Sequence, residues 1–185
     1  MHRLLLALGL FLLTASSIAA AQAGPPASRL ADLQVGVGYS GADSDYVVDH
    51  IRGIAFYASL DVTNHWGGEV DFHQLNDPQP SKVYERTYEI GPRYVLHYGR
   101  FHPYGKVLYG RGVFNFPQNV GNLAYNMFVG GAGVDINVLR RVNVRADYEY
   151  QKWLSGPGLT NGLSPQVVTI GVAYHFPAGR AHGIR

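Results

Sequence analysis

Acidic and basic side chains recur at intervals of two or four residues in several segments of the sequence. In an extended chain, residues two apart lie on the same face, so each such segment presents its charges to one side. The residues concerned are Glu69, Asp71, Glu89, Arg93, Lys106, Asp135, Arg145, Asp147 and Glu149. Charges that leave water must be paired and hydrogen-bonded. On an inward face they predict a salt-bridged plug or, if the pairs can rearrange, a narrow gated conduit for small ions.

A glycine pattern at residues 36–41 matches the dinucleotide-binding fingerprint G-x-G-x-x-G. That chemistry needs a helix directly after the glycines, so that the helix N-terminus meets the pyrophosphate. Ala42 to Asp45 follow instead, without an apolar helical stripe. The pattern therefore indicates small residues on the inner face of a strand that runs into a loop, and no cofactor is predicted.

The histidines do not form a convincing catalytic or metal-binding set. A hydrolase that pairs histidine with serine needs both side chains within hydrogen-bond reach, and His65, His97 and His102 have no serine two residues further on. His73 and Asp71 share a face but are too few for a metal site. We therefore predict no catalytic residues and no metal, and we interpret the three turn histidines as interfacial polar residues.

The first residues have the layout of an export signal. A basic start at residues 1–3 precedes an apolar run at 4–13 and a small-residue region that ends in Ala21-Gln22-Ala23. This predicts a secretory signal peptide over residues 1–23, with cleavage after Ala21 or Ala23. A barrel domain is expected over residues 24–176 and a short C-terminal tail over 177–185.

Composition narrows the class of protein further. The sequence has 15 Lys and Arg residues and 13 Asp and Glu residues. Removal of Arg3 with the signal leaves a net charge of 14 − 13 = +1. This near-neutral charge gives no electrostatic reason to expect nucleic-acid binding. The absence of cysteine excludes disulfides. The 23 glycines and 13 tyrosines suit a β-barrel, in which small residues pack the lumen and aromatic residues line the membrane interfaces.

Eight segments show period-two alternation between apolar residues and small or polar ones, which predicts eight strands. In the closing segment, Val168 to Phe176 give one apolar face, and in the fifth we place Val107 and Tyr109 outward with Lys106 inward. Pro92 lacks a donor, so a local break in pairing is expected there. The strands are predicted at residues 33–39, 53–62, 66–73, 84–96, 104–114, 128–137, 142–151 and 167–176.

Long polar connections alternate with tight turns. The long ones are predicted at 41–50, 74–81, 115–123 and 154–164. This asymmetry is typical of outer-membrane barrels, which have short periplasmic turns and longer external loops. We predict an all-β, eight-stranded antiparallel up-and-down transmembrane β-barrel. A soluble lipocalin-like binding barrel is the alternative, and it would turn the apolar face inward.

Aromatic residues favour the membrane orientation because they gather in two belts, as membrane girdles do. Near the tight turns we place Trp66, Tyr94, Tyr104, Tyr174 and Phe176. Near the long loops we place Tyr39, Tyr84, Tyr109, Tyr125, Tyr148 and Tyr150.

Four stretches resemble the small eight-stranded outer-membrane barrels of the porin family, which are related to the transmembrane domain of outer-membrane protein A. They are residues 88–94, 103–110, 130–135 and the closing strand, which ends in Tyr-x-Phe. The resemblance implies a Gram-negative-type outer membrane, contacts with lipid and lipopolysaccharide, a monomer, and insertion machinery that reads the last strand. Phe176 is not the final residue, and no peptidoglycan-binding domain is expected after it.

These observations predict a structural or surface-interaction role without catalysis. A small gated channel is the main alternative, and a lipid-modifying outer-membrane enzyme is a further one. The loops have an ordinary composition that identifies no ligand.

Overall fold

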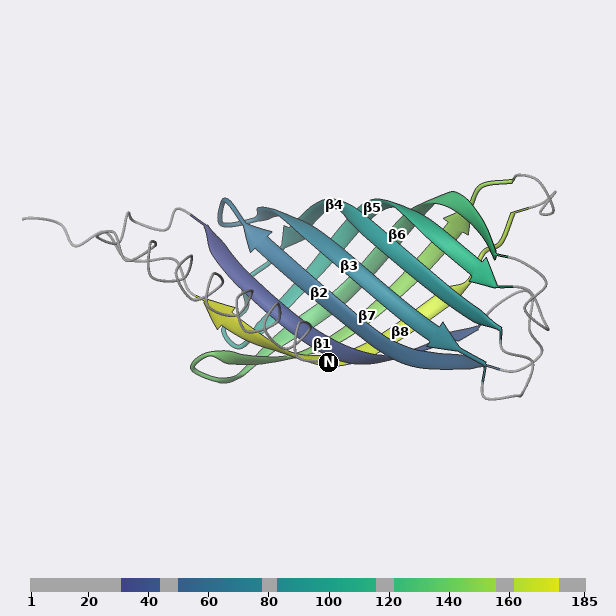
Figure 1. Ribbon diagram of the computed structural model, residues 1–185. Helices are drawn as coiled ribbons and strands as arrows, with labels where there is room; N and C mark the ends of the chain where they lie inside the picture. Colours follow the sequence, from purple (N-terminus) through teal and green to yellow (C-terminus); the bar gives the residue numbers. More distant parts are fainter. Residues whose placement is uncertain (1–30, 44–49, 78–82, 116–121, 156–161, 177–185) are drawn as a thin grey trace, which may run out of the picture. The chain divides into compact units, whose positions relative to one another are not determined.

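The computed structural model describes residues 31–43, 50–77, 83–115, 122–155 and 162–176. Within these ranges, eight antiparallel strands form one closed barrel in chain order, so the predicted fold class is confirmed (Figure 1). None of these residues belongs to a helix long and apolar enough to cross a membrane. The strands are β1 (Asp32–Asp43), β2 (Ile51–Asp61), β3 (Trp66–Asn76), β4 (Tyr84–Val95), β5 (Phe101–Asn115), β6 (Asn122–Leu139), β7 (Val142–Trp153) and β8 (Gln166–Phe176).

Several predictions lie outside the described residues. These are the signal peptide at 1–23, the tail at 177–185 and the central parts of the four long loops. The ends of the predicted loops were wrong, because the strands continue into them. β1 reaches Asp43, β3 reaches Asn76 and β6 begins at Asn122. Polar side chains at these strand ends interrupt the hydrophobic alternation while the backbone pairing continues.

Strand β1 closes the sheet by pairing with both β2 and β8. Val37, for example, lies opposite Phe56 on one side and Val172 on the other. Closure leaves no unpaired edge strand, which is a requirement for a sheet in lipid. The expected break at Pro92 is present: pairing between β4 and β5 runs to Ile90, omits two residues and resumes at Arg93 without a change of register.

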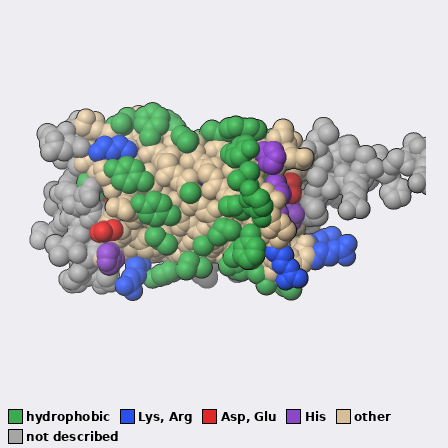
Figure 2. All heavy atoms as spheres, turned by 180° about the vertical axis from the view of Figure 1, so that it is seen from behind, with side chains coloured by type: hydrophobic (Ala, Val, Ile, Leu, Met, Phe, Trp, Pro, Cys, Tyr) green, Lys and Arg blue, Asp and Glu red, His purple; other side chains and the backbone are tan. Residues whose placement is uncertain are grey.

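The outer wall of the barrel is apolar. Ile90, Val107 and Ile170 each expose more than 60 % of their surface, and Figure 2 shows hydrophobic side chains over the wall, with charged residues and histidines gathered towards the two ends. Since the apolar phase faces outward, the lipocalin-like alternative is wrong. The predicted phase of β5 is correct, because Val107 and Tyr109 are exposed whereas Lys106 and Leu108 are buried.

The glycine pattern of residues 36–41 lies within β1, as predicted for a strand. Its inward glycines make room for an aromatic ring. A Cβ atom added at Gly36 would collide with the ring of Tyr57 on β2. This close approach lets Tyr57 extend across the interior, where it contacts the charged residues described below.

Two apolar clusters fill the loop side of the barrel interior. The larger packs around Trp153 and Met127, both fully buried, and includes Val83 and Leu163 next to the long connections. The smaller consists of Ala42, Ile51, Leu75 and Val167. The polar interior therefore lies below an apolar layer on this side.

Candidate functional site

The inward face of the strands carries the charges identified from the sequence. Each of the nine predicted residues is buried, and none exposes more than 6 % of its surface. Period-two alternation explains this placement, because each of these positions lies between neighbours that face lipid. The barrel brings the nine residues into two connected groups.

The arginine group consists of Glu69, Arg93, Asp135 and Arg145. Arg93 pairs with Asp135 at 2.5 Å and with Glu69 at 3.2 Å. Arg145 binds Asp135 through two nitrogens, at 2.7 and 3.0 Å, and Glu69 at 3.1 Å. Planar guanidinium groups make strong paired bonds of this kind. Since the residues come from β3, β4, β6 and β7, the group joins opposite walls of the barrel.

Two tyrosines cover the guanidinium groups. Arg145 lies 4.1 Å from the ring centroid of Tyr57 and 4.8 Å from that of Tyr104, while Arg93 lies 4.1 Å from Tyr104. These are cation–π distances. The Tyr104 hydroxyl also donates a hydrogen bond to Asp147 at 2.5 Å. The aromatic rings therefore complete the packing around the arginine group.

The prediction that Tyr104 belongs to the aromatic girdle was wrong. Tyr104 lies two residues before Lys106 and so shares its inward face, where only 5 % of its surface is exposed. Tyr125 was misplaced in the same way, since it is buried against Trp153. Each of the two tyrosines lies an even number of residues from a buried residue on its own strand. The period-two pattern alone would therefore have placed both on the inward face.

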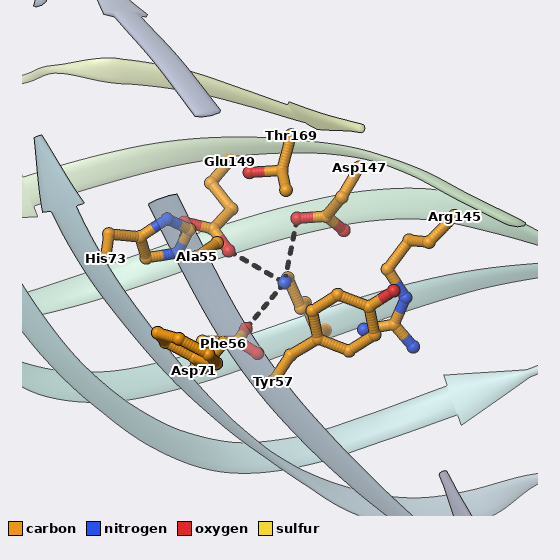
Figure 3. Close-up of a pocket in the computed structure, with 10 residues that line it drawn as sticks. Ala55, Phe56, Tyr57, Asp71, His73, Arg145, Asp147, Glu149 and Thr169 are labelled. Atoms are coloured by element: carbon orange, nitrogen blue, oxygen red, sulfur yellow. Dashed lines mark hydrogen bonds and ion pairs between the residues drawn. The ribbon is translucent and has the colours of Figure 1, made fainter. Parts of the chain in front are cut away.

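The lysine group centres on Lys106, which pairs with four carboxylates from β3 and β7. The distances from its Nζ are 2.7 Å to Asp71, 2.7 Å to Glu149, 2.9 Å to Asp147 and 2.9 Å to Glu69. Figure 3 shows three of these carboxylates converging on the ammonium. Glu69 links the lysine group to the arginine group. The adjoining cavity is barely large enough for one water molecule.

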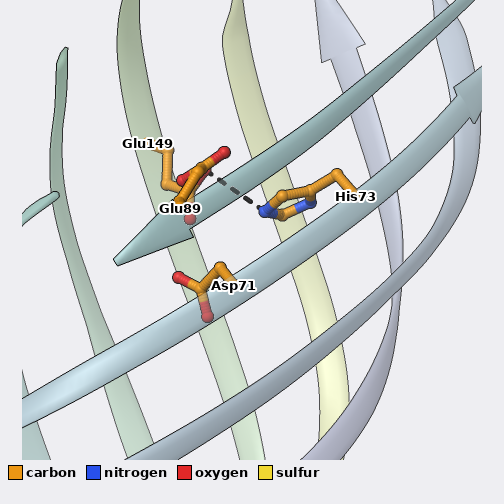
Figure 4. A group of neighbouring side chains, drawn as sticks. All are labelled: Asp71, His73, Glu89 and Glu149. Atoms are coloured by element: carbon orange, nitrogen blue, oxygen red, sulfur yellow. Dashed lines mark ion pairs between the residues drawn. The ribbon is translucent and has the colours of Figure 1, made fainter. Parts of the chain in front are cut away.

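His73 lies beside three carboxylates, Asp71, Glu89 and Glu149, as Figure 4 shows. Its Nε2 is 3.4 Å from Glu149, and its Nδ1 is 3.3 Å from the hydroxyl of Ser40, which in turn bonds to Thr169 at 2.7 Å. Asp71 and Glu89 are directly opposite each other on β3 and β4. The sequence analysis considered His73 and Asp71 alone and found too few ligands. The barrel adds two more carboxylates, Glu89 and Glu149.

The remaining girdle residues are on the outer wall or at its ends. Trp66 and Tyr94 meet at the tight-turn end with ring centroids 5.0 Å apart, and Tyr174 and Phe176 meet at 4.6 Å. Tyr84 is half-buried and donates a hydrogen bond to Asn122. Exposed aromatic residues on the loop-side part of the wall are Tyr39, Tyr109, Tyr148 and Tyr150.

The three turn histidines also gather at the tight-turn end. The ring of His97 lies 6.0 Å from that of His65 and 4.8 Å from that of His102. His65 contacts the carbonyl oxygen of Val95 at 2.9 Å, and His102 contacts Asn137 at 2.9 Å. These contacts connect the turns to one another, in keeping with the prediction of interfacial polar residues.

The sequence profile of the family described as "Outer membrane protein beta-barrel domain" matches residues 7–176. The chain belongs to this family. Family membership implies an outer-membrane location, as expected from the resemblance. No curated protein matches the sequence.

Solved outer-membrane barrels share the fold at low sequence identity. Neisserial surface protein A is 14 % identical, with a TM-score of 0.65 over 80 % of this chain and 97 % of that one. The outer membrane protein OprG of Pseudomonas aeruginosa is 16 % identical, with a TM-score of 0.61 over 82 % and 98 %. Ail, the attachment invasion locus protein of Yersinia pestis, is 19 % identical, with a TM-score of 0.51 over 79 % and 97 %.

Proposed function

We propose that this protein is a non-conducting, non-catalytic outer-membrane barrel that holds its loop-side surface rigidly at the membrane. The observation that carries the proposal is the arginine group, which links β3 and β4 to β6 and β7 across the lumen. An eight-stranded barrel is only wide enough for its own side chains. A buried ion-pair network at that level leaves no continuous aqueous path.

The apolar clusters support the same conclusion from the loop side. Trp153, Met127 and Leu108 expose 1 % of their surface or less, so they exclude water above the charges. On the opposite side of the network, Asn143 donates a hydrogen bond to Gln34, and both side chains are buried. The interior is thus filled at three successive levels.

The interior does contain a serine, a histidine and a glutamate in contact, which resembles a hydrolytic triad in composition. Ser40, His73 and Glu149 meet at 3.3 and 3.4 Å. However, a nucleophile has to reach its substrate, and Ser40 is fully buried, with its hydroxyl bonded to Thr169. This enclosure supports a role without catalysis.

Outward charges support a lipid partner on the loop side. In the described strands, the basic residues on the outward face lie near the long loops. Arg86 is half-buried, and the exposed ones are Arg52, Arg111 and Lys152. Such side chains suit the phosphate groups of lipopolysaccharide, which would place the long loops outside the cell. The closed sheet has no free strand edge, which supports a monomer. The closing strand, β8, carries exposed apolar side chains on its outward face, and these suit recognition by the insertion machinery.

Planar-bilayer recording tests the closed interior. We expect the wild-type protein to give no discrete conductance steps, whereas a triple substitution that removes one large side chain from each of the three filled levels, Trp153→Ala, Arg93→Ala and Asn143→Ala, gives measurable steps. Arg111→Ala, on the outer wall, is the matched control and stays silent. Steps from the wild type that disappear in Arg93→Ala would instead support the gated channel.

A further inference from the structure

We propose that Asp71, His73, Glu89 and Glu149 form a binding site for one divalent transition-metal ion inside the barrel. The inference is independent of the proposed function, since a closed barrel and a channel could both carry such a site. One ligand atom from each residue lies within 4.8 Å of the others. The four side chains come from β3, β4 and β7, so an ion here would join opposite walls.

Four atoms of the cluster are buried without a hydrogen bond. Two of them are in ion-pair contact: Nε2 of His73 lies 3.4 Å from Glu149, and Oε1 of Glu149 lies 2.7 Å from Lys106. The other two, Oδ1 of Asp71 and Oε2 of Glu89, have neither a hydrogen bond nor an ion pair, and neither residue exposes more than 3 % of its surface. Buried polar atoms without partners are rare in native proteins, because each costs its full desolvation energy. Both oxygens belong to the four-residue cluster, so one bound cation would satisfy them together.

The surrounding hydrogen bonds hold the ligands in place. Gln151 donates from one amide nitrogen to Glu89 at 3.1 Å and to Glu149 at 3.2 Å. Trp153 donates to the amide oxygen of Gln151 at 3.1 Å, which fixes the direction of the amide. Metal ligands are typically oriented by outer hydrogen bonds of this kind.

The other ring nitrogen of His73 has a suitable partner as well. With a proton on Nδ1, His73 donates to Ser40, whose hydroxyl can donate onward to Thr169. This tautomer directs the Nε2 lone pair at the carboxylates. Without a cation that arrangement is repulsive, and with one it is the usual geometry of a histidine ligand.

The balance of buried charges also supports a bound cation at this site. In the two groups and the cluster beside them, six buried carboxylates face three buried Lys and Arg side chains, and a protonated His73 would still leave two carboxylates in excess. Uncompensated buried charge is strongly unfavourable. The excess is greatest around the cluster, because Lys106 already serves four carboxylates. The six are Glu69, Asp71, Glu89, Asp135, Asp147 and Glu149.

The donor set selects the class of metal. One imidazole and three carboxylates suit Zn²⁺, which takes nitrogen and oxygen ligands in tetrahedral sites. Ca²⁺ and Mg²⁺ prefer oxygen ligands alone. Because all four residues are buried, the ion would enter while the barrel folds, and binding would couple to folding.

Metal counting after refolding tests the site. The protein is refolded from urea into detergent with Zn²⁺, unbound metal is removed by gel filtration, and retained zinc is counted by mass spectrometry. We expect one Zn²⁺ per wild-type chain and less than a tenth of that in Glu89→Gln and His73→Asn. Ser40→Ala, which removes only the outer hydrogen bond, should bind roughly 10–100-fold more weakly. Ca²⁺ should not replace the zinc.

Glu85→Gln is the matched control. Glu85 is buried on the same strand, four residues before Glu89 and on the same face, and its variant should retain one Zn²⁺. Heat-modifiable gel mobility verifies that each variant has folded. Co²⁺ in place of Zn²⁺ should show a visible spectrum that changes in His73→Asn. A folded wild type that retains no zinc, or equal zinc in Glu89→Gln and wild type, would overturn the proposal and leave protons as the neutralising charge.

Discussion

The arginine group and the lysine group occupy the same interior but balance their charges differently. In the first, two guanidinium groups meet two carboxylates through paired hydrogen bonds, and aromatic rings cover the cations. In the second, one ammonium meets four carboxylates, and Glu89 adds another beside His73. The first group balances two cations with two carboxylates, whereas the second has more carboxylates than cations.

This difference teaches that one buried charge network can contain a part that holds opposite barrel walls together and a part that binds an ion. We call the first part, the arginine group, the lock. Arginine suits the lock because its five donors are fixed in a plane. Lysine offers three protons on a point charge, so it cannot satisfy four carboxylates fully. Substitutions in the two groups should therefore have different consequences.

Arg145→Ala should have the largest effect on stability. The substitution leaves Asp135 and Glu69 buried without one of their two guanidinium partners, and breaking a buried pair from one side costs about 3–5 kcal/mol. Urea unfolding in lipid vesicles measures the loss. Arg111→Ala, an exposed arginine on the outer wall, should change the free energy of unfolding by less than ~0.5 kcal/mol. Equal losses in the two variants would argue against the lock.

Val107→Arg should have the next largest effect, through the lipid rather than the lumen. Val107 is 61 % exposed on the outer wall, and arginine at the bilayer midplane costs about 2–4 kcal/mol. Val138→Arg, near the tight-turn end of β6, is the control and should cost at most ~1 kcal/mol. The same unfolding measurement applies. A harmless Val107→Arg would mean that this face does not contact lipid.

Tyr104→Phe should have a smaller effect that isolates one bond between the groups. It keeps the ring over Arg93 but removes the hydroxyl that donates to Asp147, and hydrogen bonds to charged groups contribute about 1.5–3 kcal/mol. Tyr109→Phe, on the lipid face, should be neutral within ~0.5 kcal/mol. If both substitutions proved neutral, the Tyr104 hydroxyl would have no part in joining the groups.

The face of most residues could be predicted from the sequence, because a period of two is a local property. The nine charged residues lie on the inward face to which this period assigned them. The error at Tyr104 arose because its position near a turn was given more weight than its parity with Lys106. The strand ends at Asp43 and Asn76 were missed because polar residues there hide the alternation.

The composition of the candidate site could not be predicted in this way. The period of two assigns each residue to the inward or the outward face of its strand. It does not give the residue's position along the barrel axis or around it, because both positions depend on strand register and tilt. The contact between His73 and Glu149 joins β3 to β7, which are not neighbours in the sheet. Only the closed register reveals that Glu89 and Glu149 complete a cluster with Asp71.

The most direct test of the two-group account compares Asp135→Asn with Glu89→Gln by urea unfolding in lipid vesicles, with a chelator present. Asp135 accepts bonds from both arginines, so its loss should cost about 3–5 kcal/mol. Glu89 belongs to the carboxylate excess, and an amide oxygen there can still accept the bond from Gln151. Its replacement should therefore change the free energy of unfolding by at most ~1 kcal/mol or raise it. Equal losses in the two variants would contradict the account.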